Sequence, residues 1–79
     1  MAQRCTPELV IDILAKKVGI PADTPGIVTA TWEELGVESL GLSETFANLS
    51  LALGVEVPHE EALSTTNVQD LVTLVNAQF

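Results

Sequence analysis

The chain of 79 residues is 47% hydrophobic but only 4% aromatic, and three basic against eleven acidic residues give a net charge of −8. This length forms one small domain, and an aliphatic core with few aromatic rings favours packed helices over a β-sandwich. The negative charge makes nucleic acids and membrane surfaces poor partners; it either attracts basic proteins or only keeps the chain soluble.

Residues 1–5 are expected to form a flexible tail of a single domain that spans residues 1–79. Cys5, the only cysteine, is placed in this tail and cannot form an internal disulfide, which is compatible with a reducing compartment. No secretion signal opens the chain, and no apolar run approaches the roughly 18 residues of a membrane span. The expected location is therefore cytoplasmic.

The first predicted helix covers Pro7 to Val18. Thr6 supplies a capping hydroxyl, and Pro7 and Glu8 suit the first turn of a helix. Gly19 ends the helix. Its apolar residues fall at helical spacing: Leu9, Val10, Ile13, Leu14 and Val18.

A long loop is predicted from Ile20 to Gly36, because this segment contains two prolines and two glycines. Thr31–Leu35 is expected to form one helical turn within the loop. Trp32 is interpreted as the apolar anchor that packs the loop onto the bundle.

The second long helix is predicted from Ser39 to Leu53, with Gly54 as its end. A short helix is expected at His59–Leu63, and a last helix follows Asn67, which caps it together with Asp70 in an acidic variant of the capping box. The side chains expected to face the core are Leu42, Phe46, Ala47, Leu49 and Leu53 in the second helix and Val68, Leu71, Val72, Leu74 and Val75 in the last. The predicted fold is an all-α four-helix bundle, with three longer helices, one short helix and a long loop between the first two.

Ser39 raises the question of enzyme chemistry, because serine beside glycine is typical of some nucleophiles. The nucleophile elbow needs glycine two residues before and two after the serine; Gly41 fits this pattern but Val37 does not. The only base for a catalytic triad is His59, on a chain too short to build a substrate cleft as well. One cysteine and one histidine without close spacing cannot close a metal site. We therefore expect neither enzyme activity nor a bound metal.

Two interpretations of Ser39 remain open from the residues alone. Its hydroxyl could cap the helix that it begins. Alternatively, it follows a long loop and should lie at an exposed apex, where unpaired N–H groups and the helix dipole suit a phosphate-linked attachment.

The hexapeptide Leu35-Gly36-Val37-Glu38-Ser39-Leu40 resembles the attachment motif of acyl carrier proteins, Asp-Ser-Leu preceded by Leu-Gly and one variable residue. Glu38 replaces the usual Asp and keeps its charge on a longer side chain. The order of helices and loops resembles that family from about Thr6 onward. Ser39–Leu42 and Asp70–Asn76 look most like free-standing (type II) carriers of bacterial polyketide synthases.

The resemblance implies that Ser39 carries 4′-phosphopantetheine, transferred from coenzyme A, and holds polyketide intermediates as thioesters. It further implies a monomer whose partners are a phosphopantetheinyl transferase, a ketosynthase, an acyltransferase and tailoring enzymes. The expected recognition contacts are Glu38, Leu40, Glu44, Glu60 and Glu61.

Two alternatives stay open beside this hypothesis. One is a peptidyl or aryl carrier protein, although peptidyl carriers usually have two glycines where only Gly36 is present. The other is a helical interaction module without a prosthetic group, in which Ser39 is only a cap.

Overall fold

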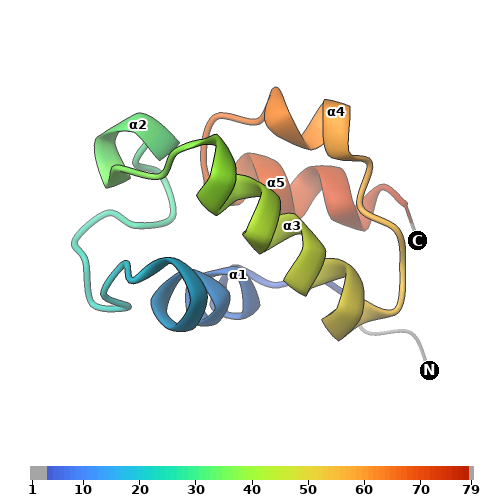
Figure 1. The fold of residues 1–79 in the computed structure, drawn as a ribbon, viewed down its shortest axis with the longest axis horizontal. Coiled ribbons are helices and arrows are strands. Elements are labelled where there is room, and N and C mark those ends of the chain that lie inside the picture. Colours follow the sequence, from blue (N-terminus) through green and yellow to red (C-terminus); the bar gives the residue numbers. More distant parts are fainter. Residues whose placement is uncertain (1–3, 79) are drawn as a thin grey trace.

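A computed structural model describes residues 4–78 as a bundle of helices (Figure 1). The elements in chain order are α1 (Pro7–Ile13), the π-helical η1 (Leu14–Val18), α2 (Trp32–Leu35), α3 (Ser39–Leu53), α4 (His59–Leu63) and α5 (Val68–Asn76). Helix α3 lies in the middle of the view and packs against α1 and η1; α5 packs against α1, and α4 contacts both α3 and α5. Residues 4–78 contain no strand, and the predicted all-α four-helix bundle is confirmed, with α2 as the turn within the long loop.

The first helix has the predicted bounds but changes its winding. The Thr6 hydroxyl accepts a hydrogen bond from the Leu9 N–H at 3.2 Å, as expected of its cap. The last five residues form a π-helix, which ends at Gly19 with φ of 87°. A π-turn is rare and shifts the register of the side chains that follow it. It leaves Val18 partly buried and facing the beginning of α3.

The later helices also begin and end as predicted. Gly54 closes α3 in the left-handed conformation, and α4 starts at His59 after Pro58. The Asn67 side chain accepts a hydrogen bond from the Asp70 N–H at 2.8 Å, which confirms its cap. The Asp70 carboxylate, however, accepts from the Thr66 N–H at 3.1 Å rather than from the N–H of Asn67. The expected capping box is therefore displaced by one residue.

The core is mostly aliphatic and takes side chains from α1, η1, α3 and α5. Its largest fully buried side chains are Leu14, Leu49, Leu71, Val10, Val68, Val75 and Thr45. Thr45 was not predicted to lie inside; its hydroxyl donates to the Gly41 carbonyl at 2.8 Å, so burial leaves no unpaired polar group. The prediction that Ala47 faces the core is wrong, because it lies about 140° around the helix from Leu42. Leu74 is only half-buried.

The segment before α1 is anchored to the last helix. The Cys5 N–H donates to Asn76 Oδ1 at 2.8 Å, and Asn76 Nδ2 donates to the Cys5 carbonyl at 3.0 Å. Cys5 is only 3% exposed and belongs to the core. The expectation of a flexible tail is therefore wrong for Cys5, while residues 1–3 lie outside the described residues.

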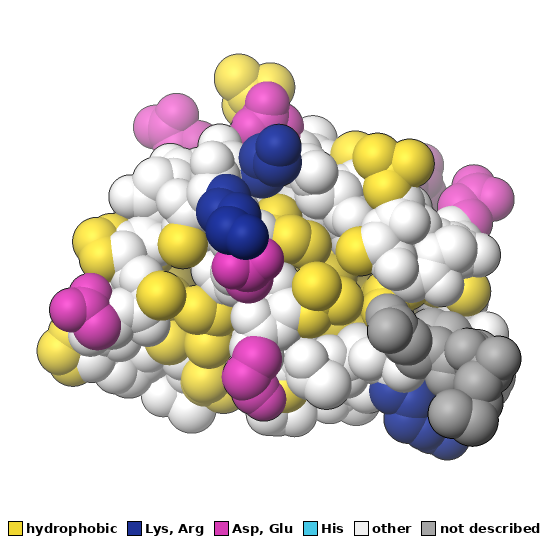
Figure 2. Space-filling view, turned by 90° about the horizontal axis from the view of Figure 1, so that it is seen from below, with side chains coloured by type: hydrophobic (Ala, Val, Ile, Leu, Met, Phe, Trp, Pro, Cys, Tyr) yellow, Lys and Arg dark blue, Asp and Glu magenta, His cyan; other side chains and the backbone are white. Residues whose placement is uncertain are grey.

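No helix within residues 4–78 is long and apolar enough to cross a membrane. Figure 2 views the molecule from the α1 side, and near the upper centre of this face it shows neighbouring basic side chains with acidic and hydrophobic side chains around them.

Truncation of the core should destabilise the bundle strongly. We expect Leu49→Ala to lower the free energy of unfolding by about 3 kcal/mol, because Leu49 is fully buried and a cavity would remain. Urea unfolding followed by circular dichroism measures the change. Leu51→Ala is the matched control on the same helix, and its effect should stay below about 0.5 kcal/mol because Leu51 is 83% exposed. Equal losses in the two variants would contradict the packing described above.

The thiol of Cys5 should be unreactive in the folded protein. Burial raises the pKa of the Cys5 thiol to about 11, so almost none of it is the reactive thiolate at neutral pH. We expect iodoacetamide to label Cys5 slowly in buffer and rapidly in urea, as measured by intact mass. Labelling at the same rate in both conditions would show that the segment is not anchored.

Candidate functional site at the beginning of α3

Ser39 is the first residue of α3 and is exposed to solvent. The N-cap position is occupied by Glu38, and no side-chain hydrogen bond caps the helix. The interpretation of Ser39 as a capping residue is thus not what the structure shows. Its hydroxyl lies at the surface, where another molecule can reach it.

A short turn presents this serine. Helix α2 ends at Gly36, whose φ of 77° reverses the chain at no steric cost for glycine. The Val37 N–H then donates to the Trp32 carbonyl at 2.8 Å, and the Val37 side chain is buried. The first hydrogen bond of α3 follows, from the Leu42 N–H to the Glu38 carbonyl at 2.9 Å. Ser39 is therefore held between a buried valine and a regular helix.

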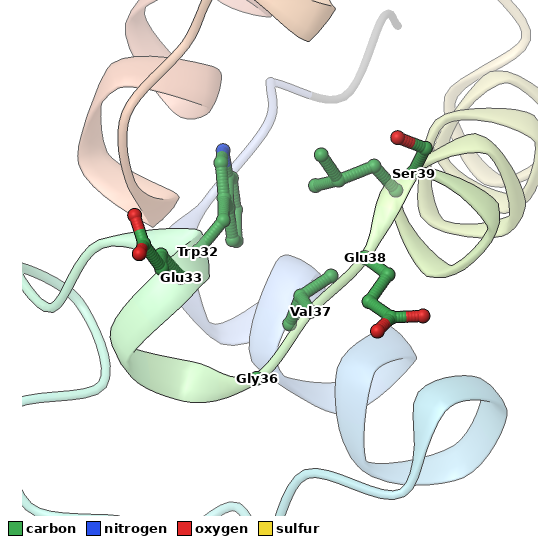
Figure 3. A pocket seen from close by; sticks show the side chains of 7 residues that line it. Trp32, Glu33, Gly36, Val37, Glu38 and Ser39 are labelled. Atoms are coloured by element: carbon green, nitrogen blue, oxygen red, sulfur yellow. The ribbon is translucent and has the colours of Figure 1, made fainter.

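The amino end of α3 is electropositive in its backbone. Its first N–H groups have no partner within the helix, and the dipole of a 15-residue helix adds partial positive charge there. The carboxylate of Glu38 opposes this field, but Figure 3 shows its side chain directed away from the hydroxyl of Ser39. An anion bonded to Ser39 would thus meet backbone donors first.

A hollow of about 510 Å³ opens beside Ser39. In Figure 3 the ring of Trp32 and the side chain of Ser39 face this hollow from opposite sides, and Val37 lies between them. The full lining is Trp32, Glu33, Gly36, Val37, Glu38, Ser39 and Leu42. We predicted Trp32 as an anchor of the loop, which its burial confirms, but not as a wall beside the serine. The sequence contained one indication of this role: Trp32 lies seven residues before Ser39, in the helical turn expected within the loop.

A second hollow of about 280 Å³ shares Gly36 and Glu38 with the first. Its lining brings together three residues expected to contact partners, Glu38, Leu40 and Glu44, with Lys17 and Val18 from η1. A side chain at Gly41 would meet Val18 Cγ1 at 3.2 Å, so glycine lets α3 approach η1 closely.

The other expected contact residues lie elsewhere. Glu60 and Glu61 are exposed in the first turn of α4 and line neither hollow. His59 is also exposed, and its ring contacts Phe46 edge to face at 5.5 Å between centroids. Within residues 4–78, no group of three His, Cys, Asp or Glu side chains could hold a metal ion.

The wall of the first hollow depends on contacts between the long loop and the α4–α5 connection. The Trp32 N–H donates to the Thr66 carbonyl at 3.0 Å, and the indole Nε1 donates to Thr65 Oγ1 at 3.2 Å. Helix α2 is also closed by a capping box, in which Thr31 and Glu34 exchange hydrogen bonds at 2.9 and 3.1 Å. These bonds fix the indole ring beside Ser39.

The capping box should make the stability of α2, which holds Trp32 beside the first hollow, depend on pH. Hydrogen bonds from Thr31 lower the pKa of the Glu34 carboxyl below its usual 4.5. The resulting stabilisation is complete above the unfolded-state pKa and is lost as pH falls through the lower, folded-state value. We therefore expect Glu34→Ala to reduce stability more at pH 7 than at pH 2, in urea unfolding followed by the fluorescence of Trp32. An equal difference at both pH values would contradict the capping role of the carboxylate.

Comparison with known proteins gives one family match, to the model described as "Phosphopantetheine attachment site", over residues 8–75. The actinorhodin holo acyl carrier protein from S. coelicolor is 27% identical, with a TM-score of 0.77, over 98% of this chain and 93% of that one. A 3,5-dioxohexyl acyl carrier protein from the actinorhodin polyketide synthase of Streptomyces coelicolor, described as a triketide mimic, is 28% identical, with a TM-score of 0.80 and the same coverage of both chains. The 3-oxo-butyl form from the same synthase is 26% identical, with a TM-score of 0.79 and again the same coverage of both chains.

Proposed function

Because the chain belongs to the family of phosphopantetheine attachment sites, we propose that Ser39 is the residue that bears 4′-phosphopantetheine. The observation that carries the proposal is the exposed hydroxyl at the uncapped amino end of α3. The family makes the chain a carrier of a prosthetic group and not an enzyme, as we predicted from the sequence.

The residues around Ser39 fit a phosphodiester. The unpaired N–H groups of the first turn can donate to phosphate oxygens, and the helix dipole favours negative charge there. The Ser39 oxygen would form the new bond to the phosphorus that bears the pantetheine arm and lose its proton to a base, while the pyrophosphate bond of coenzyme A breaks and its nucleotide part leaves with the second phosphate. His59, the only histidine of the chain, lines neither hollow, and the Glu38 carboxylate is directed away from the Ser39 hydroxyl, so we expect the transferase to supply that base.

When bound, the prosthetic arm supplies a terminal thiol that holds an acyl chain as a thioester. The role of this chain is to fix the attachment point on a rigid helix and to expose it. An intermediate tethered in this way reaches successive enzymes at high effective concentration. We propose polyketide intermediates as the cargo, since the similar structures include a holo acyl carrier protein and carriers of an intermediate mimic and of a triketide mimic from the actinorhodin polyketide synthase.

The proposed partners follow from the cargo and from the surface beside Ser39. They are a phosphopantetheinyl transferase, a ketosynthase, an acyltransferase and tailoring enzymes, each acting on a monomeric carrier. Glu38, Leu40 and Glu44 surround the attachment point and are the proposed contacts, with Glu60 and Glu61 on α4 as further acidic contacts. Within α3 the only charged residue is Glu44, so docking should combine one ion pair with apolar contacts.

The attachment is tested by intact mass after incubation with coenzyme A and a broad-range phosphopantetheinyl transferase. We expect the parent protein to gain the mass of one pantetheine arm and Ser39→Ala to gain none. Ser43→Ala is the matched control on the same helix and should be modified like the parent.

Two results would contradict the proposal. A parent protein that gains no mass would favour a helical interaction module without a prosthetic group. A Ser39→Ala variant that is still modified would move the attachment point to another residue.

A further inference from the structure

Helix α3, the longest helix in the bundle, begins without the side-chain cap that three other helices have. Thr6, Thr31 and Asn67 each occupy the N-cap of a helix and accept a hydrogen bond from the N–H three residues further along. At α3 the same position holds Glu38, which makes no such bond. Within residues 4–78, the N–H of Gly41, three residues after Glu38, therefore has no side-chain acceptor.

The missing cap follows from the length of the side chain and not from the backbone. Glu38 has φ of −94° and ψ of 175°, an extended conformation like that of the capping residue Thr6, at −124° and 154°. The favoured N-cap side chains are those of Ser, Thr, Asp and Asn, which are short enough to place an oxygen beside the first-turn N–H groups. Glu38 carries its carboxylate one methylene further from the backbone, and Figure 3 shows it directed away from Ser39.

An acceptor bonded to Ser39 would fit the place that Glu38 leaves empty. Ser39 is the first residue of α3 and is exposed, so a group on its oxygen lies beside the free N–H groups of the first turn. The family match over residues 8–75 indicates such a group independently of the helix, because a phosphopantetheine arm is attached through a phosphodiester. Its unesterified oxygens accept hydrogen bonds, and its negative charge is stabilised at the amino end of a helix.

We infer that the phosphate of the prosthetic arm caps α3, and that Glu38 is the residue that leaves the cap position open for it. This inference rests on the proposed function of Ser39. It gives the attachment a structural effect: the unmodified protein has free donors at the start of its longest helix, and the modified protein has them paired. A side-chain cap typically raises the folding equilibrium constant about fivefold, and we expect the phosphate to have an effect of this size.

The first test compares the parent protein before and after modification by coenzyme A and a broad-range phosphopantetheinyl transferase, with completeness checked by intact mass. We expect modification to raise the folding equilibrium constant, measured by urea unfolding, about fivefold. Ser39→Ala treated in the same way is the control and should not change. Amide hydrogen exchange measured by NMR locates the effect: exchange at Gly41 should slow more than exchange at Asp70, whose N–H is bonded to Asn67 in both forms.

A second test uses three variants of Glu38 to separate the cap from the charge. Glu38→Asp and Glu38→Asn introduce short capping side chains, with and without charge, whereas Glu38→Gln keeps the length and removes the charge. In the unmodified protein, we expect each short side chain to raise the folding equilibrium constant about fivefold over the long side chain of the same charge. Modification should then stabilise the two short variants less than about twofold, because the Gly41 N–H is already bonded, and should stabilise Glu38→Gln at least as much as the parent.

The possible results are distinguishable. A parent protein that is not modified would overturn the proposed function itself. A parent that is modified but is equally stable in both forms, with unchanged exchange at Gly41, would overturn only the cap. Short variants that gain as much from modification as the parent, or a gain that follows the charge at position 38 and not the length, would also overturn it. If the transferase does not accept a variant of Glu38, the two forms of the parent decide.

Discussion

The position of Ser39 depends on the hydrogen bonds that join the long loop to the α4–α5 connection and to the first turn of α5. Besides the two bonds of Trp32, Asn67 Nδ2 donates to the Thr29 carbonyl at 3.2 Å, and the Gln69 N–H donates to the Val28 carbonyl at 3.2 Å. A loop of this length loses much conformational entropy when it is ordered, and these bonds help to offset that loss. Because they fix α2, they also fix the turn at Gly36 from which the serine is presented.

Most element boundaries could be predicted because they depend on local chemistry. Gly19, Gly36 and Gly54 each end a helix in the left-handed conformation, and Thr6 and Asn67 each cap one. The errors had separate causes, and only one of them was a contact with a distant residue. A buried Cys5 requires Asn76, 71 positions away, and a buried Thr45 requires an acceptor on its own helix that periodicity of apolar residues does not reveal. Ala47 was misplaced because alanine is equally acceptable on either side of a helix.

The sequence predicted which residues form the candidate site but not the shape of the surface around them. The motif around Ser39 indicated the family, which the match over residues 8–75 confirms, and the phosphopantetheine cofactor goes with that family. Attachment at Ser39 itself stays a prediction, as do the partner contacts. The hollow against Trp32 could not be predicted, because it depends on bonds to Thr65 and Thr66, more than 30 residues along the chain. Local sequence places the serine; tertiary contacts build the surface around it.

The pair of hydrogen bonds between Cys5 and Asn76 determines where other chains can be attached to the protein. It brings both ends of the described chain to one part of the molecule, near where α3 ends, whereas Ser39 begins that helix (Figure 1). A linker, an affinity tag or a neighbouring domain joined at either end would therefore leave the serine unobstructed. Immobilisation on a solid support through such a linker should be compatible with catalysis by enzymes that approach from the opposite end.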